Sequence, residues 1–280
     1  MWPARVAIVG GGTMGAGIAR VFASHEIPTV LFDTAPERTE AASIADAVAG
    51  AELIVEAVFE RPDVKTEVYE EIEAAAADSA VIATNTSSIP IAQLAAGLRR
   101  PERFLGMHWF VPPLLVPCVE VIPAPATDEQ VVQKAVDALT RLSKAAVVVG
   151  DGPGFVANRI QFAMFREAAR IVEEGLATPE QVDEVVRSSF GFRLPFFGPF
   201  TIADLAGLDV YADIFETLEH GLGPGFSAPE ILREHVDRGE FGVKTGRGFL
   251  ELSQAEGDHL ITRRDAAYAK LAELRREVGL

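Results

Sequence analysis

The chain has 280 residues, 49% of them hydrophobic, which is enough to build two globular domains of ordinary size. Its 25 basic and 41 acidic residues leave a net charge of −16, so we expect no binding to nucleic acid or to anionic membrane surfaces. No apolar run approaches the roughly 20 residues of a membrane span. The single cysteine, Cys118, excludes an intramolecular disulfide and a multi-cysteine metal site, and we predict no metal. The first strand pattern begins a few residues after Met1, which leaves no room for a signal peptide and predicts a cytoplasmic protein.

The N-terminal stretch has the pattern of a dinucleotide-binding loop. Residues 6–9 form an apolar run typical of a buried parallel strand, and glycines follow at positions 10, 12 and 15 in the G-x-G-x-x-G spacing. Gly10 permits a tight turn, Gly12 lets the backbone approach a pyrophosphate, and Gly15 lets the next helix pack closely. A helix over residues 14–24 would then present its N-terminus to the phosphates.

A second strand, residues 29–32, ends at Asp33. An acidic side chain at this place accepts a hydrogen bond from the ribose 2'-hydroxyl and repels a 2'-phosphate, so it favours NAD over NADP. A glycine triplet alone is a weak signal, but strand, glycines, helix and terminal acid together predict NAD binding.

Strand and helix patterns alternate through the first half of the chain. The stretch between Asp33 and Glu56 is short and alanine-rich, and we expect one helix, a brief strand or turn near residues 43–44 and a further helical turn there. Further strands are expected at residues 53–58, 80–84, 104–108, 119–122 and 146–149, with helices at 62–77, 90–97 and 128–143. This alternation predicts an α/β fold with a Rossmann-type, doubly wound and mostly parallel sheet.

Residues 150–154 are expected to form a boundary, because five residues of turn chemistry separate a strand pattern from a long helical one. Beyond them no convincing strand run follows. A helix is predicted over residues 155–174, which are mostly apolar and expected to be buried. A second begins after Thr178, which with Gln181 forms a capping pattern, and a third begins after a Ser227 cap. The last is predicted over residues 268–278. We therefore predict an NAD-binding domain at residues 1–150 and an all-helical C-terminal domain at residues 151–280.

His108 is the best candidate for the base that takes or gives a hydroxyl proton during hydride transfer. It ends a strand that runs toward the edge where doubly wound sheets bind ligands, and Glu120 stands in the next strand segment. A carboxylate on one imidazole nitrogen would fix the tautomer and leave the other nitrogen as the base. A structural histidine with an unrelated surface glutamate explains the spacing equally well.

Three further polar positions have both a functional and a structural interpretation. Residues 85–88 follow a strand at the same edge and could face nicotinamide and substrate, or could form a turn and a helix cap. Asn158 lies one turn into the apolar helix, where it either caps a backbone group or faces the site. Lys65 could be a solvated helix charge or could reach the cofactor.

Taken together, the motifs resemble those of the L-3-hydroxyacyl-CoA dehydrogenases and their lambda-crystallin-like relatives, which act in fatty acid metabolism. The similarity covers nearly the whole chain. Eight segments carry it in order: VGGGTMGAG (9–17), EAVFERPDVK (56–65), NTSS (85–88), GMHWFVPP (106–113), VEVI (119–122), DGPGFVANR (151–159), GPFTIADLAGLD (198–209) and GVKTGRGF (242–249).

The resemblance implies NAD-dependent oxidation or reduction of a 3-hydroxyacyl substrate, and a homodimer built by the helical domain. It makes His108 the catalytic base and Glu120 its carboxylate partner, with Ser87 and Asn158 hydrogen-bonded to the small-molecule substrate. Cofactor contacts are then expected from Gly10, Gly12, Thr13, Met14, Gly15, Asp33, Ala57, Val58, Glu60, Lys65 and Asn85.

Two departures from the family pattern bear on the substrate. Val111 stands where the family usually has an asparagine before the proline of its histidine loop, so a polar contact is missing or replaced. The stretch from Asp33 to Glu56 is also too short for the family's long helical insertion, part of which clasps the CoA moiety. The substrate is therefore either a 3-hydroxyacyl-CoA that is held differently, or a free or otherwise conjugated 3-hydroxy acid.

Two other classes of protein are less well supported. A dinucleotide-binding structural protein without turnover has only Val111 in its favour. The 3-hydroxyisobutyrate-type dehydrogenases share the opening G-x-G-x-M-G but use a lysine in the interdomain helix, whereas this chain has Asn158, Arg159 and no lysine before Glu174. The aromatic segments 190–192 and 194–197 fit either an apolar pocket or a dimer contact.

Overall fold

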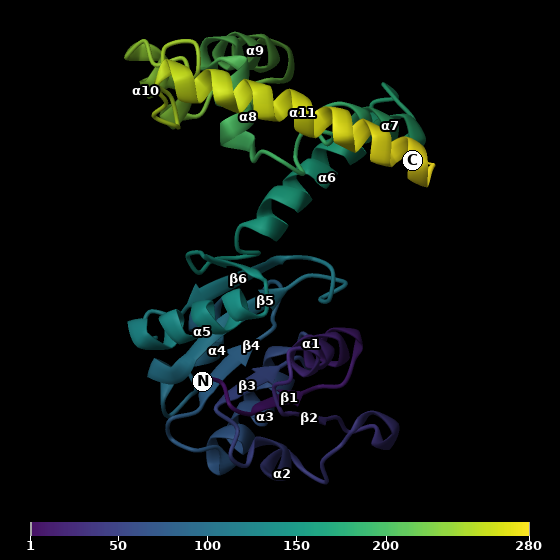
Figure 1. The fold of residues 1–280 in the computed structure, drawn as a ribbon, viewed down its shortest axis with the longest axis vertical. Helices are drawn as coiled ribbons and strands as arrows, with labels where there is room; N and C mark the ends of the chain where they lie inside the picture. Colours follow the sequence, from purple (N-terminus) through teal and green to yellow (C-terminus); the bar gives the residue numbers. More distant parts are fainter. Residues whose placement is uncertain (1, 280) are drawn as a thin grey trace. The chain divides into compact units, whose positions relative to one another are not determined.

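The computed structural model describes residues 2–279 (Figure 1). Internal contacts divide the chain into two compact units, Met1–Arg166 and Glu167–Leu280, so the division falls inside one helix, α6 (Ala157–Glu173). The predicted domain boundary at residues 150 and 151 was placed by turn chemistry instead, and it stays a prediction.

The first unit is built on a seven-stranded sheet within the described residues, in the spatial order β2-β1-β3-β4-β5-β6-β7 (Figure 1). Its strands are β1 (Val6–Val9), β2 (Thr29–Phe32), β3 (Leu53–Glu56), β4 (Val81–Thr84), β5 (Phe104–Trp109), β6 (Cys118–Pro123) and β7 (Ala145–Val148). Neighbouring strands are parallel except β5 and β6, which are antiparallel. The predicted Rossmann-type, mostly parallel sheet is confirmed.

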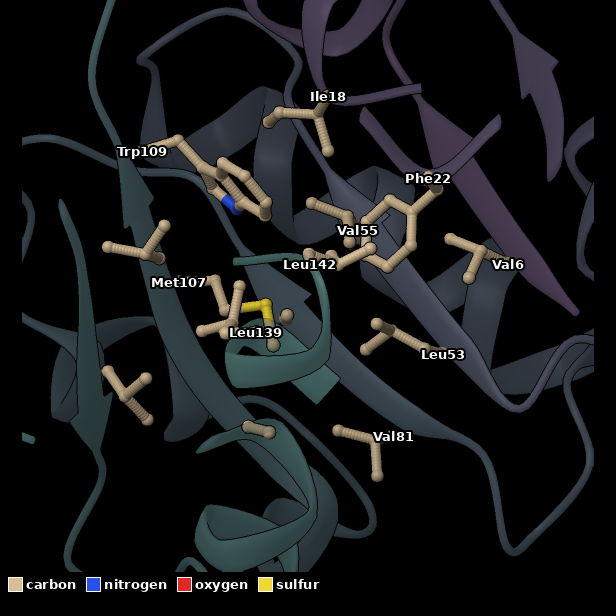
Figure 2. Packing of buried hydrophobic residues seen from close by; sticks show 14 of the residues in the cluster. Val6, Ile18, Phe22, Leu53, Val55, Val81, Met107, Trp109, Leu139 and Leu142 are labelled. Atoms are coloured by element: carbon tan, nitrogen blue, oxygen red, sulfur yellow. The ribbon is translucent and has the colours of Figure 1, made fainter. Parts of the chain in front are cut away.

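Helices of the first unit cover both faces of this sheet, because the residues along each buried strand point alternately to opposite sides. The helices are α1 (Thr13–Ser24), α2 (Ile44–Val48), α3 (Pro62–Ala75), α4 (Ile91–Ala95) and α5 (Glu129–Arg141), with 3₁₀ turns η1 (Pro36–Arg38) and η2 (Pro101–Arg103). Val6 packs with Phe22 of α1 and Leu139 of α5 in one core cluster (Figure 2). Val9 belongs to the opposite cluster, which includes Tyr69 of α3.

Of the strand or turn expected near residues 43–44, the structure has no strand: residues 41–43 are bends that lead into α2. Ser43 is the N-cap of α2, and its Oγ accepts a hydrogen bond from the Asp46 N–H. Helix α6 was expected to be buried, and none of its residues is. Its large apolar side chains Ile160, Phe162, Met164 and Phe165 are exposed.

The second unit is helical, as predicted, with α7 (Pro179–Ser188), α8 (Pro199–Ala206), α9 (Leu208–Leu222), the 3₁₀ turn η3 (Pro224–Phe226), α10 (Glu230–Asp237) and α11 (Gln254–Val278). Thr178 and Gln181 form the predicted capping box of α7. Ser227 does not cap α10, whose N-cap is Pro229, because its hydroxyl donates to Glu219 and to the Pro224 carbonyl.

Helix α11 begins at Gln254, well before the predicted start at Tyr268. The rings of Phe192, Phe196 and Phe197 surround Tyr268, with centroid distances of 5.6 to 6.3 Å. These aromatic residues therefore dock α11 within the second unit.

Asp204 holds together the two motifs of the second unit that carried the family resemblance. Its side chain is buried and accepts hydrogen bonds from the Phe249 N–H at 3.1 Å and the Leu250 N–H at 2.7 Å. Gly242, with φ +80°, packs directly on the Asp204 backbone. Asp204 and Gly242 thus have a structural role within the second unit.

No helix in residues 2–279 is both long and apolar enough to cross a membrane.

Candidate active site

In the glycine loop between β1 and α1, close backbone contacts leave no room for a side chain at Gly10 or Gly15, whereas Gly12 borders open space. A Cβ on Gly10, whose φ is +108°, would lie 2.5 Å from the Ala57 carbonyl oxygen, and a Cβ on Gly15 would collide with the Gly10 carbonyl. A Cβ on Gly12 would enter open space. No side chain caps the N-terminus of α1. The loop therefore fits a pyrophosphate held at a helix N-terminus.

Asp33 follows β2 and faces this loop. Its Oδ2 accepts a hydrogen bond from the Gly11 N–H at 2.6 Å, and its Oδ1 accepts from the Ala35 N–H at 2.8 Å and the Arg38 guanidinium at 3.0 Å. Burial raises the pKa of this carboxyl, but these hydrogen bonds outweigh burial and hold the pKa below its ordinary value. Asp33 is therefore an ionised acceptor beside the loop, which fits the ribose role.

Thr13 and Met14 open α1, and Ala57 and Val58 follow β3, so these four predicted cofactor contacts lie beside the glycines. The Ala57 N–H donates to the Val9 carbonyl at 2.7 Å, which joins the ends of β1 and β3. From β1 the chain adds β2 on one side of the sheet and then β3 and β4 on the other, so the strand order switches between β1 and β3. Ligands of doubly wound sheets bind at such a switch point.

Glu60 organises the loop after β4. Its Oε1 accepts hydrogen bonds from the Thr86 hydroxyl at 2.6 Å, the Ser87 N–H at 2.8 Å and the Ser88 N–H at 3.1 Å. Burial raises the pKa of Glu60, but these bonds and the charge of Lys65 bring it below 4.5. The loop that carries Ser87 is thus bound to a carboxylate that stays ionised.

Lys65 lies inside the protein and is not a solvated helix charge. Its side chain is 1% exposed, and its Nζ lies 2.7 Å from Glu56 Oε1 and 3.4 Å from Glu60 Oε2. Glu56 Oε2 also accepts from the Tyr69 hydroxyl at 2.6 Å and the Thr84 hydroxyl at 2.8 Å. Burial and the Glu56 charge raise the pKa of Tyr69 well above 10, so its hydroxyl remains a donor. No sequence motif had indicated a role for the side chains of Glu56 and Tyr69.

Asn85 and Asn158 connect the ends of different elements. Asn85 Oδ1 accepts from the Trp109 N–H at 3.0 Å, which joins the end of β4 to the end of β5. Asn158 Nδ2 donates to the Ser87 carbonyl at 2.7 Å, so it does not cap its own helix. Asn158 therefore places the start of α6 against the Ser87 loop.

His108 and Glu120 face each other across the antiparallel pair β5 and β6. Both side chains are buried, and His108 Nδ1 lies 2.7 Å from Glu120 Oε2. Glu120 Oε1 accepts from the Val156 N–H at 3.1 Å and the Ala157 N–H at 2.9 Å, at the start of α6. A carboxylate only accepts, so Nδ1 is the donor in this pair, and in the neutral form of the ring Nε2 is the nitrogen with the free lone pair.

The loop after β5 contains Val111, which stands where the family usually has an asparagine, and its side chain is exposed. Lys144, which the sequence analysis did not select, is buried beneath this loop and donates to the carbonyls of Pro113 and Val116. Desolvation lowers the pKa of Lys144. Among residues 2–279, no group of His, Cys, Asp and Glu side chains is arranged to hold a metal ion.

Two family models match the chain. The NAD binding domain of 3-hydroxyacyl-CoA dehydrogenase matches in two segments, residues 5–45 and 39–152, and the C-terminal domain of 3-hydroxyacyl-CoA dehydrogenase matches residues 154–252. The two segments of the first model overlap at residues 39–45, in the stretch between β2 and β3.

The chain is similar to curated proteins of two kinds. It is 34% identical to the 5-formyl-3-hydroxy-2-methylpyridine 4-carboxylate 5-dehydrogenase of Mesorhizobium japonicum, over 88% of this chain and 89% of the relative. It is also 34% identical to a probable 3-hydroxybutyryl-CoA dehydrogenase of Bacillus subtilis, over 89% of this chain and 98% of the relative.

Among solved structures, a 3-hydroxyacyl-CoA dehydrogenase from Archaeoglobus fulgidus has a TM-score of 0.83 and 32% identity to the chain. The similarity covers 99% of both chains, so it includes α11, which lies beyond the two family models.

Proposed function

Because the chain belongs to the 3-hydroxyacyl-CoA dehydrogenase family, we propose that His108 is the base of its reaction and that Glu120 positions this base. The chain is an NAD-dependent oxidoreductase that acts on a CH–OH group. NAD, when bound, supplies the hydride acceptor. The observation that carries the proposal is the 2.7 Å contact between His108 Nδ1 and Glu120 Oε2, which directs Nδ1 to the carboxylate and leaves Nε2 to face a ligand.

During oxidation the hydroxyl proton of the substrate passes to His108 Nε2 while the carbon loses a hydride, so the products are a ketone and an imidazolium. Glu120 stabilises this positive charge through Nδ1. Glu120 is itself held by two backbone N–H groups of residues 156 and 157, so the imidazole does not need to reorient during the reaction.

We assign the cofactor to the edge formed by the ends of β1, β2, β3 and β4. Gly12 and the uncapped α1 would hold the phosphates, with Thr13 and Met14 beside them, and Asp33 would bind the ribose. Glu60, Lys65 and Asn85 would line the cofactor, and through their hydrogen bonds and ion pairs they also shape the Ser87 loop and the end of β5.

Ser87 and Asn158 would orient the oxygens of the substrate. The Asn158 amide nitrogen already donates to the Ser87 carbonyl, and the Ser87 hydroxyl donates to Glu60 Oε1 at 3.2 Å. The Asn158 amide oxygen and the lone pairs of the Ser87 hydroxyl oxygen are therefore the acceptors that remain for a ligand.

The substrate is a 3-hydroxyacyl compound, and the identity of its carrier decides between two versions of the proposal. The Bacillus subtilis relative is named for a CoA thioester, which favours a 3-hydroxyacyl-CoA. The Mesorhizobium japonicum relative is named for a pyridine carboxylate, and the segment between β2 and β3 contains only η1 and α2. These two observations favour a substrate without CoA.

Specificity constants separate the two versions. kcat/KM would be measured with NAD for 3-hydroxybutyryl-CoA and for 3-hydroxybutyrate, following NADH absorbance. A large preference for the thioester removes the version without CoA. Equal or higher values for the free acid support it.

We further propose that the chain is a homodimer. Ile160, Phe162 and Phe165 on α6 are 57%, 63% and 66% exposed, and large exposed apolar side chains that lie close together mark protein–protein contacts. A second copy would cover them. Sedimentation velocity tests this, and a monomer at micromolar concentration would contradict it.

A cytoplasmic location also stays a prediction, which fractionation of the source cells tests.

A further inference from the structure

The shortened segment between β2 and β3 brings an arginine to the glycine loop. Arg38 ends η1, and its N–H donates to the Ala35 carbonyl at 2.9 Å. A Cβ placed on Gly11 would lie 2.9 Å from the Arg38 carbonyl oxygen and 3.2 Å from the Arg38 Cβ. The arginine backbone is therefore packed against the loop that receives the cofactor.

The Arg38 guanidinium lies beside Asp33, with Nη2 3.0 Å from Oδ1. This is the one hydrogen-bonded partner of the Arg38 side chain in residues 2–279, and the side chain is 51% exposed. A guanidinium has five N–H donors, so most of them remain available to a ligand. Asp33 Oδ2 points to Gly11 instead, so the two oxygens of this carboxylate face different partners.

A carboxylate and an arginine at this position have opposite preferences for the cofactor. An acid accepts hydrogen bonds from the ribose and repels a 2'-phosphate, whereas an arginine binds a 2'-phosphate through charge-assisted hydrogen bonds. While Asp33 is present, the arginine is engaged by its carboxylate. The contact with Arg38 also fixes Asp33 Oδ1, while the Gly11 N–H holds Oδ2, so the carboxylate has a defined orientation beside the loop.

We propose that Arg38 is a second determinant of cofactor choice: it orients Asp33 for NAD and forms a latent 2'-phosphate site that Asp33 masks. Removing the acid alone would therefore convert the ribose site from one that rejects NADP to one that binds it. No new positive charge would be needed. The proposal depends on NAD binding but not on the identity of the hydroxy substrate or on the role of His108.

The test is a cycle of variants at the two positions, read by direct binding without substrate. Asp33→Ser, Arg38→Ala and the double variant are titrated with NADPH and NADH by fluorescence and with 2',5'-ADP by calorimetry. We expect Asp33→Ser to bind NADPH and 2',5'-ADP at least roughly tenfold more tightly than the wild type, the size of one charge-assisted hydrogen bond. Arg38→Ala in that background should remove the gain, and Arg38→Ala alone should weaken NADH binding several-fold.

Arg20→Ala removes an exposed positive charge from α1 and serves as the matched control, with wild-type binding of both cofactors expected. Asp33→Asn is the second variant if Asp33→Ser does not fold, because it keeps an acceptor for the Gly11 N–H. A gain in NADPH affinity that survives Arg38→Ala would overturn the proposal. So would folded Asp33 variants that bind NADPH no better than the wild type.

Discussion

Glu120 Oε2 lies 2.7 Å from His108 Nδ1, and the two residues occupy opposite positions in the register of β5 and β6. The second carboxylate oxygen accepts hydrogen bonds from the Val156 and Ala157 N–H groups. Glu120 therefore joins the proposed base to the start of α6, and its two oxygens have separate tasks.

Glu120→Gln separates these tasks. The glutamine oxygen can still accept from the start of α6, so the melting temperature should change little. Its amide would donate toward Nδ1, which requires the opposite tautomer and places a proton on Nε2. We expect kcat to fall by roughly 10² to 10⁴, with the NADH dissociation constant unchanged. Glu129→Gln, on the surface of α5, is the control. A glutamine variant with wild-type kcat would show that the carboxylate does not position His108.

Lys65→Met tests the buried charge between Glu56 and Glu60. Removing the ammonium leaves the Glu56 carboxylate buried without its cation, so unfolding free energy should fall by about 3 to 5 kcal/mol in urea denaturation. The Lys65→Met, Glu56→Gln double variant should recover part of the loss, because it removes the uncompensated charge. Equal stability of single variant and wild type would mean that the 2.7 Å pair contributes nothing.

Asn158→Ala tests the contact between the start of α6 and the Ser87 carbonyl. The variant loses the 2.7 Å hydrogen bond and the amide oxygen proposed to face substrate. We expect kcat/KM for the hydroxy substrate to fall about tenfold or more, in line with the loss of one or two hydrogen bonds. NADH binding should be unaffected. Gln161→Ala, exposed on the same helix, is the control, and a loss of equal size there would contradict a specific role for Asn158.

The lowered pKa of Glu60 predicts how the melting temperature of the protein depends on pH. Its pKa is lower in the folded chain than its ordinary value of 4.5, so ionised Glu60 stabilises the fold at neutral pH. This contribution is present above pH 4.5 and disappears as pH falls through the lower, folded-state pKa. Glu60→Gln should therefore melt at a lower temperature than the wild type at pH 7, and the difference should shrink below pH 4.5. A difference that stays constant between pH 7 and pH 3.5 would contradict the assignment.

The sequence was sufficient for features that depend on neighbouring residues. The glycine spacing and the strand before it define a local turn, so Gly10, Gly15 and Asp33 could be located without a structure. His108 and Glu120 are only 12 residues apart across one loop, so a simple hairpin pairing brings them together. Strand and helix order was predictable for the same reason, since each element has its own apolar period.

Features that depend on distant packing were missed or wrong. The partnership of Glu56 with Tyr69 requires knowledge of which face of α3 meets β3. The Val156 N–H reaches Glu120 across 36 residues, and no local pattern indicates that. The early start of α11 did have a readable signal, because Ser253 and Glu256 form a capping box. The exposure of α6 could not be predicted, since an apolar pattern does not show whether the side chains are covered by the rest of the same chain.

The most direct test of the proposed mechanism is kcat for His108→Gln and His108→Ala, measured with NAD and the better of 3-hydroxybutyryl-CoA and 3-hydroxybutyrate. If His108 Nε2 takes the hydroxyl proton, kcat falls by roughly 10² to 10⁴ while NADH binding stays near wild type. Folded His108 variants that turn over at nearly the wild-type rate would contradict the assignment of His108 as the base.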